Sequence, residues 1–439
     1  MSNLHINVNQ SESIIEYNVP PTLINKLYKL VNRENNGENI FDNNTNIIGT
    51  INTGYTYEEY INVIRNRFNQ LHINAEGYYI LFKDAAVEQI CIDNFSIDGI
   101  GVTQRDVSKV NTFKINNVNI FNGNTEIESF DELSNFTSLI EINDNAFSNC
   151  TNLKHVDLTN IQVLGFSCFE NTALEGDIYM PKLQRAVGSF YGTNITSVSN
   201  LGSIMNIQSS KWTGSYHGLF QNCTLLKSVK LPETVTILDN GAFRGCTSLE
   251  TINFPLSITT LNSECLSNLT SVKDTLAYFP NVRSVGVFIF GGSNYQYVYL
   301  NNLEEPDTWG YFNNWTYHAG LFMTNRGDKT YKLIYLKKIK YLPAGAFGRC
   351  QINYVIINNE TPPELLIDDY NSNAFTASTI AFIVVPDTAV QTYKENTSWA
   401  PYSDKIIGLS IMSKIATREQ FDEKLNNGDS TIYLIEEYM

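Results

Sequence analysis

The chain has 439 residues, of which 43% are hydrophobic, and a formal net charge of −15 at pH 7. This hydrophobic content is sufficient for a packed core, which excludes disorder as the main state. The negative charge and the lack of any Lys/Arg cluster argue against nucleic acid or an anionic membrane as the main partner.

The first 80 residues predict a small α/β segment. Its start, MSNLHINVNQSESIIEYNVPP, has no basic stretch and no continuous apolar stretch, so we expect no secretory signal. No part of the chain reaches the ~18 apolar residues of a membrane span, which excludes membrane insertion. Residues 20–35 and 56–68 have the apolar spacing of helices, and the second begins with a capping box from Thr56 to Glu59. We expect this segment to cap the first repeat or to anchor the protein elsewhere.

One phrase recurs along the middle of the chain. It reads AFSNCTNL from Ala146, LFQNCTLL from Leu219 and AFRGCTSL from Ala242. Weaker copies centre on Phe169, Phe190, Leu266, Phe290, Phe322, Phe347 and Phe375. Uninterrupted neighbours lie about 21–25 residues apart, the spacing of leucine-rich repeats. Each phrase is followed by a Val-x-Leu alternation, so each unit predicts one short strand, and stacked units predict a parallel β-sheet solenoid.

The cysteines occupy fixed positions in this repeat. Cys150, Cys223, Cys246 and Cys350 share one position, and Cys168 and Cys265 share the position just before the Phe. We therefore predict that they pack as small buried residues. Disulfides or a metal site are the alternative, but there is no CxxC motif and the five histidines are scattered. We expect no metal and no cofactor.

Two units carry long insertions just before the repeat Phe, at Phe220 and Phe322. Insertions at one phase of a solenoid emerge on one side, which is often the binding side. Their aromatic residues suit a glycan or a protein partner, and the alternative is that the loops fold back and bury their rings. The candidate binding residues in these loops are Trp212, Tyr216, Trp309, Tyr311, Trp315 and Tyr317.

The strand YQYVYL adds two further candidates. If Val298 and Leu300 point inward, Tyr297 and Tyr299 face outward on the sheet and are plausible contact residues. No nucleophile, metalloprotease, phosphate-loop or dinucleotide motif is present, so we predict that the protein is not an enzyme.

The end of the chain predicts a small separate unit. A capping box from Thr417 to Gln420 starts a helix that stops near Gly428, and the strand TIYLI follows. This unit resembles small terminal modules of phage tail and fibre proteins.

The repeat pattern resembles the BspA-like bacterial leucine-rich repeats, which also occur in phages. The resemblance runs from about residue 80 to 410 and includes the lead-in at residues 87–110, where the family commonly has an EF-hand-like loop. Here Ile100 stands where a ligand is expected and Asp106 is the only late acid, so we expect a degraded, metal-free loop. At the other end, residues 382–406 resemble the family's closing Val-Pro strand and helix. The resemblance implies a curved solenoid with a binding or adhesion role.

We therefore expect four regions: an N-terminal segment (1–80), a lead-in (81–135), the leucine-rich-repeat solenoid (136–385) and a C-terminal cap with a terminal module (386–439). We favour a phage virion component, associated with a tail or fibre, that contacts other virion proteins or a bacterial surface receptor, either protein or glycan. This hypothesis rests on the missing signal, the additional N-terminal segment and the phage-like end. The alternative is an adhesin of the bacterial cell surface.

Overall fold

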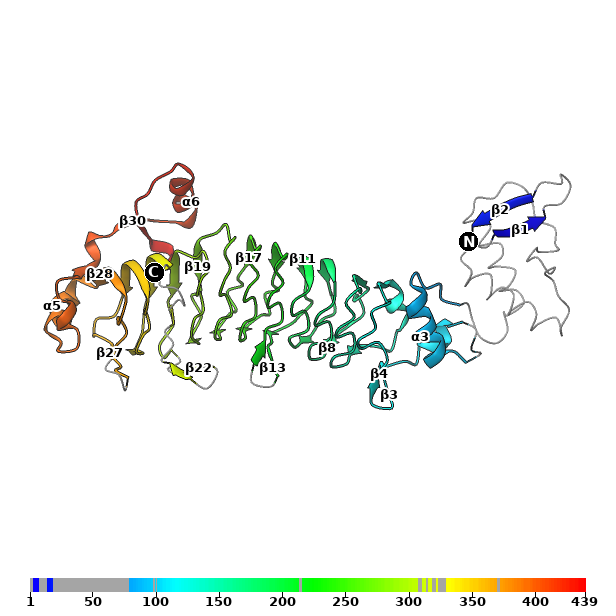
Figure 1. Ribbon diagram of the computed structural model, residues 1–439. Coiled ribbons are helices and arrows are strands. Elements are labelled where there is room, and N and C mark those ends of the chain that lie inside the picture. Colours follow the sequence, from blue (N-terminus) through cyan, green and yellow to red (C-terminus); the bar gives the residue numbers. More distant parts are fainter. Residues whose placement is uncertain are drawn as a thin grey trace. The chain divides into compact units, whose positions relative to one another are not determined.

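The structure is a computed structural model. It describes the strands Asn3–Asn7 and Ile14–Asn18 and residues 79–439, apart from 98, 100, 213–214, 307–309, 313–314, 318–320, 323–328 and 369–371. For residues 3–7, 14–18, 211–212, 215, 310–312, 315–317 and 329 it describes the backbone alone. The chain forms two compact units, residues 1–112 with 126–140 and 155–157, and residues 113–125 with 141–154 and 158–439 (Figure 1).

The first unit includes residues 81–112 and 126–135 of the lead-in. Helix α3 (Ala85–Phe95) begins at Asp84, whose carboxylate accepts two backbone hydrogen bonds from the first turn. Helix α4 (Gln104–Val107) begins with a capping box between Thr103 and Asp106. The Asp106 carboxylate accepts hydrogen bonds from the Thr103 backbone and hydroxyl, both at 2.8 Å. It therefore has a structural role as a helix cap.

A short parallel pair closes this unit. It joins β5 (Ser129–Phe130) to β7 (His155–Val156), and the 3₁₀ helix η1 (Asp131–Asn135) follows β5. The rings of Phe130 and Phe136 meet edge to face beneath it, with centroids 5.5 Å apart. The strands β1 (Asn3–Asn7) and β2 (Ile14–Asn18) form an antiparallel pair. The helices predicted over 20–35 and 56–68 lie outside the described residues.

The second unit contains the coils of the solenoid. Successive coils stack so that their strands pair in parallel on two sides, marked in Figure 1 by β11, β17 and β19 on one side and by β8 and β27 on the other. The first side consists of β9 (Glu175–Tyr179), β11 (Asn194–Asn200), β15 (Ser228–Lys230) and β17 (Thr251–Asn253), then β19 (Leu276–Tyr278), β21 (Tyr297–Leu300), β24 (Lys329–Leu336), β26 (Cys350–Ile357), β28 (Thr379–Val385) and β29 (Ile406–Gly408). The second side consists of β6 (Glu141–Ile142), β8 (Val163–Leu164) and β10 (Arg185–Ala186), then β12 (Asn206–Ile207), β16 (Ile237–Leu238), β18 (Thr260–Leu261) and β20 (Ser284–Val285), and finally β25 (Tyr341–Leu342) and β27 (Glu364–Leu365).

The repeat phenylalanines form a continuous column inside the solenoid. Phe147, Phe169 and Phe190 stack face to face at 5.4 and 5.7 Å. Phe190 and Phe220 continue the column at 5.6 Å, with ring planes 1° apart. Phe243 follows at 5.4 Å. The column is interrupted at Leu266, which is also fully buried. It resumes with Phe290, Phe322, Phe347 and Phe375 at 5.4 to 6.2 Å. The prediction that the repeat positions line one shared interior is therefore confirmed, with a phenylalanine in every coil of this column except that of Leu266.

The cysteines are buried, as predicted. All seven are free thiols with almost no exposed surface. The four that share one repeat position also share one contact, because each thiol donates a hydrogen bond to the carbonyl of the Phe one coil earlier. These bonds run from Cys150 to Phe121, Cys223 to Phe190, Cys246 to Phe220 and Cys350 to Phe322, at 2.9 to 3.0 Å. The thiol thus joins neighbouring coils in addition to filling space.

Where the structure describes it, the residue two places after a column position adopts a left-handed backbone. It is Asn149, Asn171, Gly192, Asn222, Gly245, Asn268, Gly292, Arg349 and Ala377, with φ between 58° and 77°. Asn and Gly tolerate this conformation better than other residues. The recurrent Asn before the cysteine is therefore a requirement of the turn.

Other asparagines bond to the coil before them. Their side-chain amides donate to backbone carbonyls 20 to 27 residues earlier. The donors are Asn152, Asn253, Asn281, Asn294, Asn302 and Asn359. Each of these bonds joins neighbouring coils, so the Asn side chains support the stacking of coils.

The last coils are closed by a helical cap. It comprises η2 (Asp387–Ala389), α5 (Val390–Glu395) and η3 (Ala400–Tyr402). Trp399 is fully buried, donates its indole N–H to the Pro363 carbonyl at 2.8 Å, and places its ring at an angle of 71° to Phe375 at the end of the column. This agrees with the closing strand and helix that the family resemblance implied.

The chain then folds back as a C-terminal module (residues 413–439). It consists of β30 (Ser413–Ile415), α6 (Arg418–Asn426), β31 (Tyr433–Ile435) and η5 (Glu436–Tyr438), and η4 (Leu409–Ile411) leads into it. The two strands pair in parallel. Thr417 caps α6 by accepting from the Gln420 backbone N–H at 3.3 Å, and Gly428 ends it with φ 77°. The predicted helix and strand are therefore confirmed.

Candidate binding surface

The outer face of the first side changes character along the solenoid. Over β9 to β17 it is polar and open. Asp177 projects from β9 and accepts hydrogen bonds from the hydroxyls of Ser197 and Ser199 on β11. Beside these residues, Tyr179 is 52% exposed and Lys230 is also exposed. We call this part the polar half of the face.

The aromatic half begins at β19. Two rows of apolar side chains follow the register of the parallel pairs, one across the five strands from β19 to β28 and the other across the six strands from β19 to β29. One row is Leu276, Tyr297, Leu333, Tyr354 and Phe382, and the other is Tyr278, Tyr299, Tyr335, Ile356, Val384 and Ile407. Such a face is unfavourable in water and needs a cover.

The C-terminal module provides that cover. Phe421 of α6 meets the ring of Tyr297 edge to face, with centroids 4.9 Å apart. Leu434 and Ile435 of β31 belong to the same buried cluster as Tyr297 and Tyr299. The prediction that these two tyrosines are exposed contact residues is therefore wrong, because they retain only 1% and 0% exposure. Their outward direction was expected, but the later segment that buries them was not.

Polar contacts fix the module in place. The Tyr299 hydroxyl accepts a hydrogen bond from the Ile435 backbone N–H at 3.1 Å. Arg418 forms an ion pair with Asp274 at 2.8 Å, and the Asn301 amide donates to the Tyr438 carbonyl at 2.6 Å. Burial raises the pKa of Tyr297 to about 12. The module therefore docks in one defined orientation.

The two predicted insertions form antiparallel hairpins. The first pairs β13 (Ser210–Trp212) with β14 (Ser215–His217), and the second pairs β22 (Gly310–Phe312) with β23 (Trp315–Tyr317). Both project from the lower edge of the solenoid in Figure 1. In the first hairpin the Tyr216 side chain is 43% exposed.

For four of the other hairpin candidates the structure describes the backbone position but not the side chain. Trp212, Tyr311, Trp315 and Tyr317 lie on hairpin strands whose backbone alone is described, and Trp309 lies outside the described residues. The hairpins thus bring the described candidates to the same edge of the solenoid, while Tyr297 and Tyr299 belong to the covered sheet.

The base of the first hairpin is held by both neighbouring coils. On one side the His217 ring stacks on Tyr191, with centroids 4.2 Å apart, and its Nδ1 lies 3.5 Å from a Glu170 oxygen. On the other side the Asp239 carboxylate accepts bonds from the backbone and hydroxyl of Ser209, at 3.1 and 2.9 Å. Contacts with both neighbouring coils therefore fix the position of the hairpin base.

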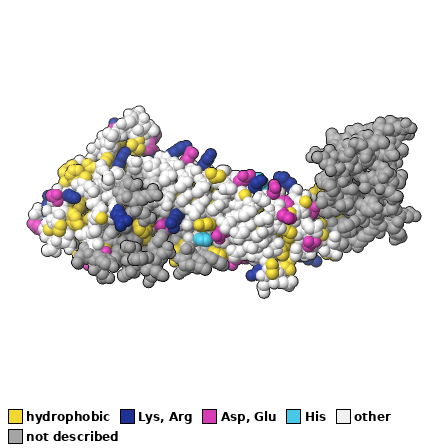
Figure 2. All heavy atoms as spheres, in the orientation of Figure 1, with side chains coloured by type: hydrophobic (Ala, Val, Ile, Leu, Met, Phe, Trp, Pro, Cys, Tyr) yellow, Lys and Arg dark blue, Asp and Glu magenta, His cyan; other side chains and the backbone are white. Residues whose placement is uncertain are grey.

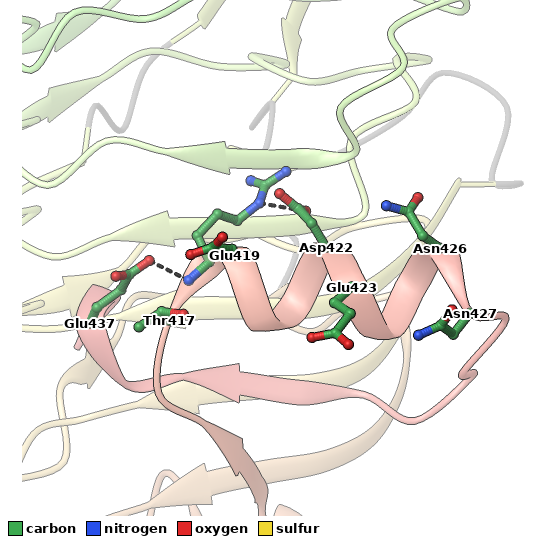
Figure 3. Close-up of a pocket in the computed structure, with 8 residues that line it drawn as sticks. Thr417, Glu419, Asp422, Glu423, Asn426, Asn427 and Glu437 are labelled. Carbon is green, nitrogen blue, oxygen red and sulfur yellow. Dashed lines mark hydrogen bonds and ion pairs between the residues drawn. The ribbon is translucent and has the colours of Figure 1, made fainter.

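Figure 3 shows a shallow pocket on the outer side of α6. Its carboxylates include Glu419, Asp422, Glu423 and Glu437. Asp422 accepts from the Arg418 guanidinium at 2.7 Å, and Glu437 accepts from the Arg418 backbone N–H. These two acids have structural partners, and we assign the pocket no binding role.

Charges are dispersed over the solenoid. Figure 2 shows acidic and basic side chains interspersed along the upper edge of the face in view. Within the described part of the chain, no group of three or more His, Cys, Asp or Glu side chains is arranged to hold a metal ion. Among the helices that the structure defines, none has the length and apolar composition of a membrane span.

Residues 104–217 and 189–314 match the family described as "BspA type Leucine rich repeat region", in six copies. The repeats within residues 104–314 are therefore of the BspA type. No curated protein matches the chain at a significant level.

Solved structures resemble the BspA-type solenoid at low identity. A leucine-rich repeat protein from Bacteroides ovatus is 17% identical over 62% of this chain and 82% of its own, with a TM-score of 0.32. The pneumococcal vaccine antigen PcpA is 16% identical over 62% of this chain and 64% of its own, with a TM-score of 0.31. A leucine-rich cell surface protein from Faecalibacterium prausnitzii is 16% identical over 65% of this chain and 79% of its own, with a TM-score of 0.25.

Proposed function

We propose that this BspA-type repeat protein is a non-catalytic binding protein that contacts its partner through the hairpins on one edge of the solenoid. The observation that carries the proposal is the placement of the two aromatic hairpins at one phase of a rigid stack, with Tyr216 exposed at the first. The interior is filled by the phenylalanine column, so the ligand is expected on the outer surface. The candidate contacts are Trp212, Tyr216, Trp309, Tyr311, Trp315 and Tyr317.

The test compares hairpin variants with a matched control in binding to whole bacterial cells. Tyr216→Ala and the double variant Trp309→Ala with Trp315→Ala should each lower binding by the full-length protein. Aromatic anchors commonly contribute ~2 kcal/mol or more, which is roughly a thirtyfold change in affinity. Tyr179→Ala, in the polar half, removes an exposed tyrosine ring outside the hairpins and should leave binding unchanged. Equal losses in all three variants would overturn the assignment of the hairpins.

For the biological setting we propose a phage virion, with the protein associated with a tail or fibre. The support is the resemblance of the C-terminal module to terminal modules of phage tail proteins. Because that module uses its apolar side to cover the sheet, attachment to other virion proteins would fall to the segment before the repeats, residues 1–80. Mass spectrometry of purified particles and of bacterial surface fractions separates the two settings. Detection on cells and absence from particles would favour the adhesin alternative.

A further inference from the structure

A third hairpin projects from the same edge as the two aromatic ones. It pairs β3 (Lys114–Ile115) with β4 (Val118–Asn119), and a tight turn of two left-handed asparagines joins the strands. Val118 is 64% exposed on it. Figure 1 shows the β3–β4, β13 and β22 hairpins along the lower edge of the second unit. The sequence pattern did not reveal this third hairpin, because it is short and carries no aromatic residue.

In the sequence, each of the three hairpins lies just before a residue of the phenylalanine column. They precede Phe121, Phe220 and Phe322. From Phe121 the column passes through Phe147, Phe169 and Phe190 to Phe220, which is four steps of 5.0 to 5.7 Å. From Phe220 it passes through Phe243, Leu266 and Phe290 to Phe322, which is again four steps. The hairpins therefore recur at every fourth coil, about 20 Å apart at the usual spacing of paired strands.

The interval between the hairpins is set by the coils that lie between them and by contacts at the hairpin bases. The intervening coils make the same connection without a hairpin, as at Asp239–Ala242 before Phe243. The base of the β3–β4 hairpin is fixed by an Asn119 amide that donates to the Asp144 carbonyl of the next coil at 2.8 Å. The base of β13–β14 is fixed by Tyr191 and Asp239 on either side. A partner would thus meet three projections at equal intervals, and the first two have bases fixed to neighbouring coils.

The residues of the hairpins differ from the rest of the chain in charge. The segments 114–119, 210–217 and 310–317 read KINNVN, SKWTGSYH and GYFNNWTY and contain no Asp or Glu, although the whole chain carries a net charge of −15. Lys114 and Lys211 are the only Lys or Arg residues among them. The other side chains combine flat aromatic or aliphatic groups with amides and hydroxyls. Such a combination suits an uncharged partner rich in hydroxyl groups.

We propose that the three hairpins form one linear contact surface that binds a single extended neutral polysaccharide chain along the solenoid edge. This inference rests on the proposed function, since it names the partner of the same hairpins. A repeating polymer offers equivalent sites at regular intervals, which matches projections at a fixed four-coil interval. Linked contacts of this kind raise affinity well beyond that of each contact alone.

The first experiment uses the full-length chain and a panel of immobilised neutral glucans, mannans, galactans and xylans. Each bound polysaccharide is then cut into fragments shorter than the hairpin spacing and chains long enough to span it. Affinity should rise on the order of a hundredfold or more from short to long, because the later contacts become intramolecular. Equal affinity for short and long fragments would overturn the linear surface. Binding to none of the panel would overturn the polysaccharide class, as would a protein found as the sole ligand.

The second experiment changes the spacing and leaves every hairpin intact. Deleting residues 244–266 removes the coil centred on Leu266 and joins Phe243 to Ser267, so the last two hairpins become three coils apart. Long-chain affinity should fall on the order of tenfold or more, while short-fragment affinity stays unchanged. Inserting a second copy of residues 221–243 at the junction restores four coils and should restore long-chain binding. Circular dichroism and thermal melting confirm that each variant is folded.

The outcomes separate this inference from the proposed function. If Tyr216→Ala weakens binding but the coil deletion does not, the hairpins bind as proposed and the four-coil surface is wrong. If neither change has an effect, the proposed function fails as well.

Discussion

Tyr438 stacks face to face on Tyr278, with ring centroids 3.9 Å apart and ring planes 9° apart. The contact joins the end of the C-terminal module to the first strand of the aromatic half. The contact marks one boundary of the area that the C-terminal module covers. The strand before β19 is β17, which carries polar residues on the same face. The module is too small to have a core of its own, and it uses the sheet as the other half of its core.

The first prediction concerns the docking of this module. Phe421→Ala removes a buried ring against Tyr297 and should cost about 3–5 kcal/mol of local stability. Hydrogen exchange should then become faster in residues 413–439 and over the sheet beneath them, and remain unchanged around Phe147. Glu419→Ala, on the exposed side of α6, is the matched control. Faster exchange throughout the solenoid would show that the module is not an independent element.

The second prediction concerns the phenylalanine column. Phe243 is fully buried between Phe220 and the Leu266 coil, so Phe243→Ala should lower the free energy of unfolding by about 3–5 kcal/mol. Phe382 is 39% exposed at the margin of the aromatic half, and Phe382→Ala should cost clearly less. Denaturant titrations of both variants test this order. Equal losses would contradict a shared interior whose coils support one another.

The third prediction concerns the thiols. Burial raises the pKa of Cys150 to about 11 and of Cys223 to about 12. A thiol reagent should therefore label native protein slowly and label it fully after unfolding. Rapid, complete labelling of native protein at pH 8 would contradict burial.

The same shifts make stability depend on alkaline pH. Because the pKa is raised in the folded state, the folded protein keeps its thiol protons where the unfolded chain has lost them. The contribution of these protonated thiols to the free energy of unfolding is fully present below about pH 8.5, the ordinary thiol pKa. It is lost as the pH rises through the folded-state pKa values of about 11 and about 12. Thermal unfolding from pH 8 to 11 should show a falling midpoint, and Cys223→Ala should reduce the slope.

The fourth prediction concerns the left-handed turn position. Ala377 adopts φ 60° and Gly245 adopts φ 77° at equivalent places in different coils. A non-glycine residue in this left-handed conformation destabilises the fold by ~1–2 kcal/mol. Ala377→Gly should therefore raise the unfolding midpoint slightly, and Gly245→Ala should lower it. A Cβ at Gly245 would also lie 2.5 Å from the Asn222 side chain. Opposite signs in the two variants, measured by thermal melting, are the expected result.

The repeat itself could be predicted from the sequence because its interior is periodic. One Phe per coil, a small residue before it and a cysteine after it recur along the chain, and the structure places them in one column. The roles of the asparagines could not be seen in the same way. Some serve the left-handed turn and others bond to the previous coil, and both roles depend on which backbone groups the stacking leaves without partners.

The candidate site was predictable only where it followed the repeat phase. The insertions before Phe220 and Phe322 interrupt a regular spacing, so their shared edge was visible in the sequence. For Tyr297 and Tyr299 the alternation along β21 predicted their direction but not their exposure. Exposure depends on a segment more than one hundred residues later in the chain, and local periodicity carries no information about such a contact. The sequence alone determined the coil and its interior, and only the tertiary structure decided which outer face remained open.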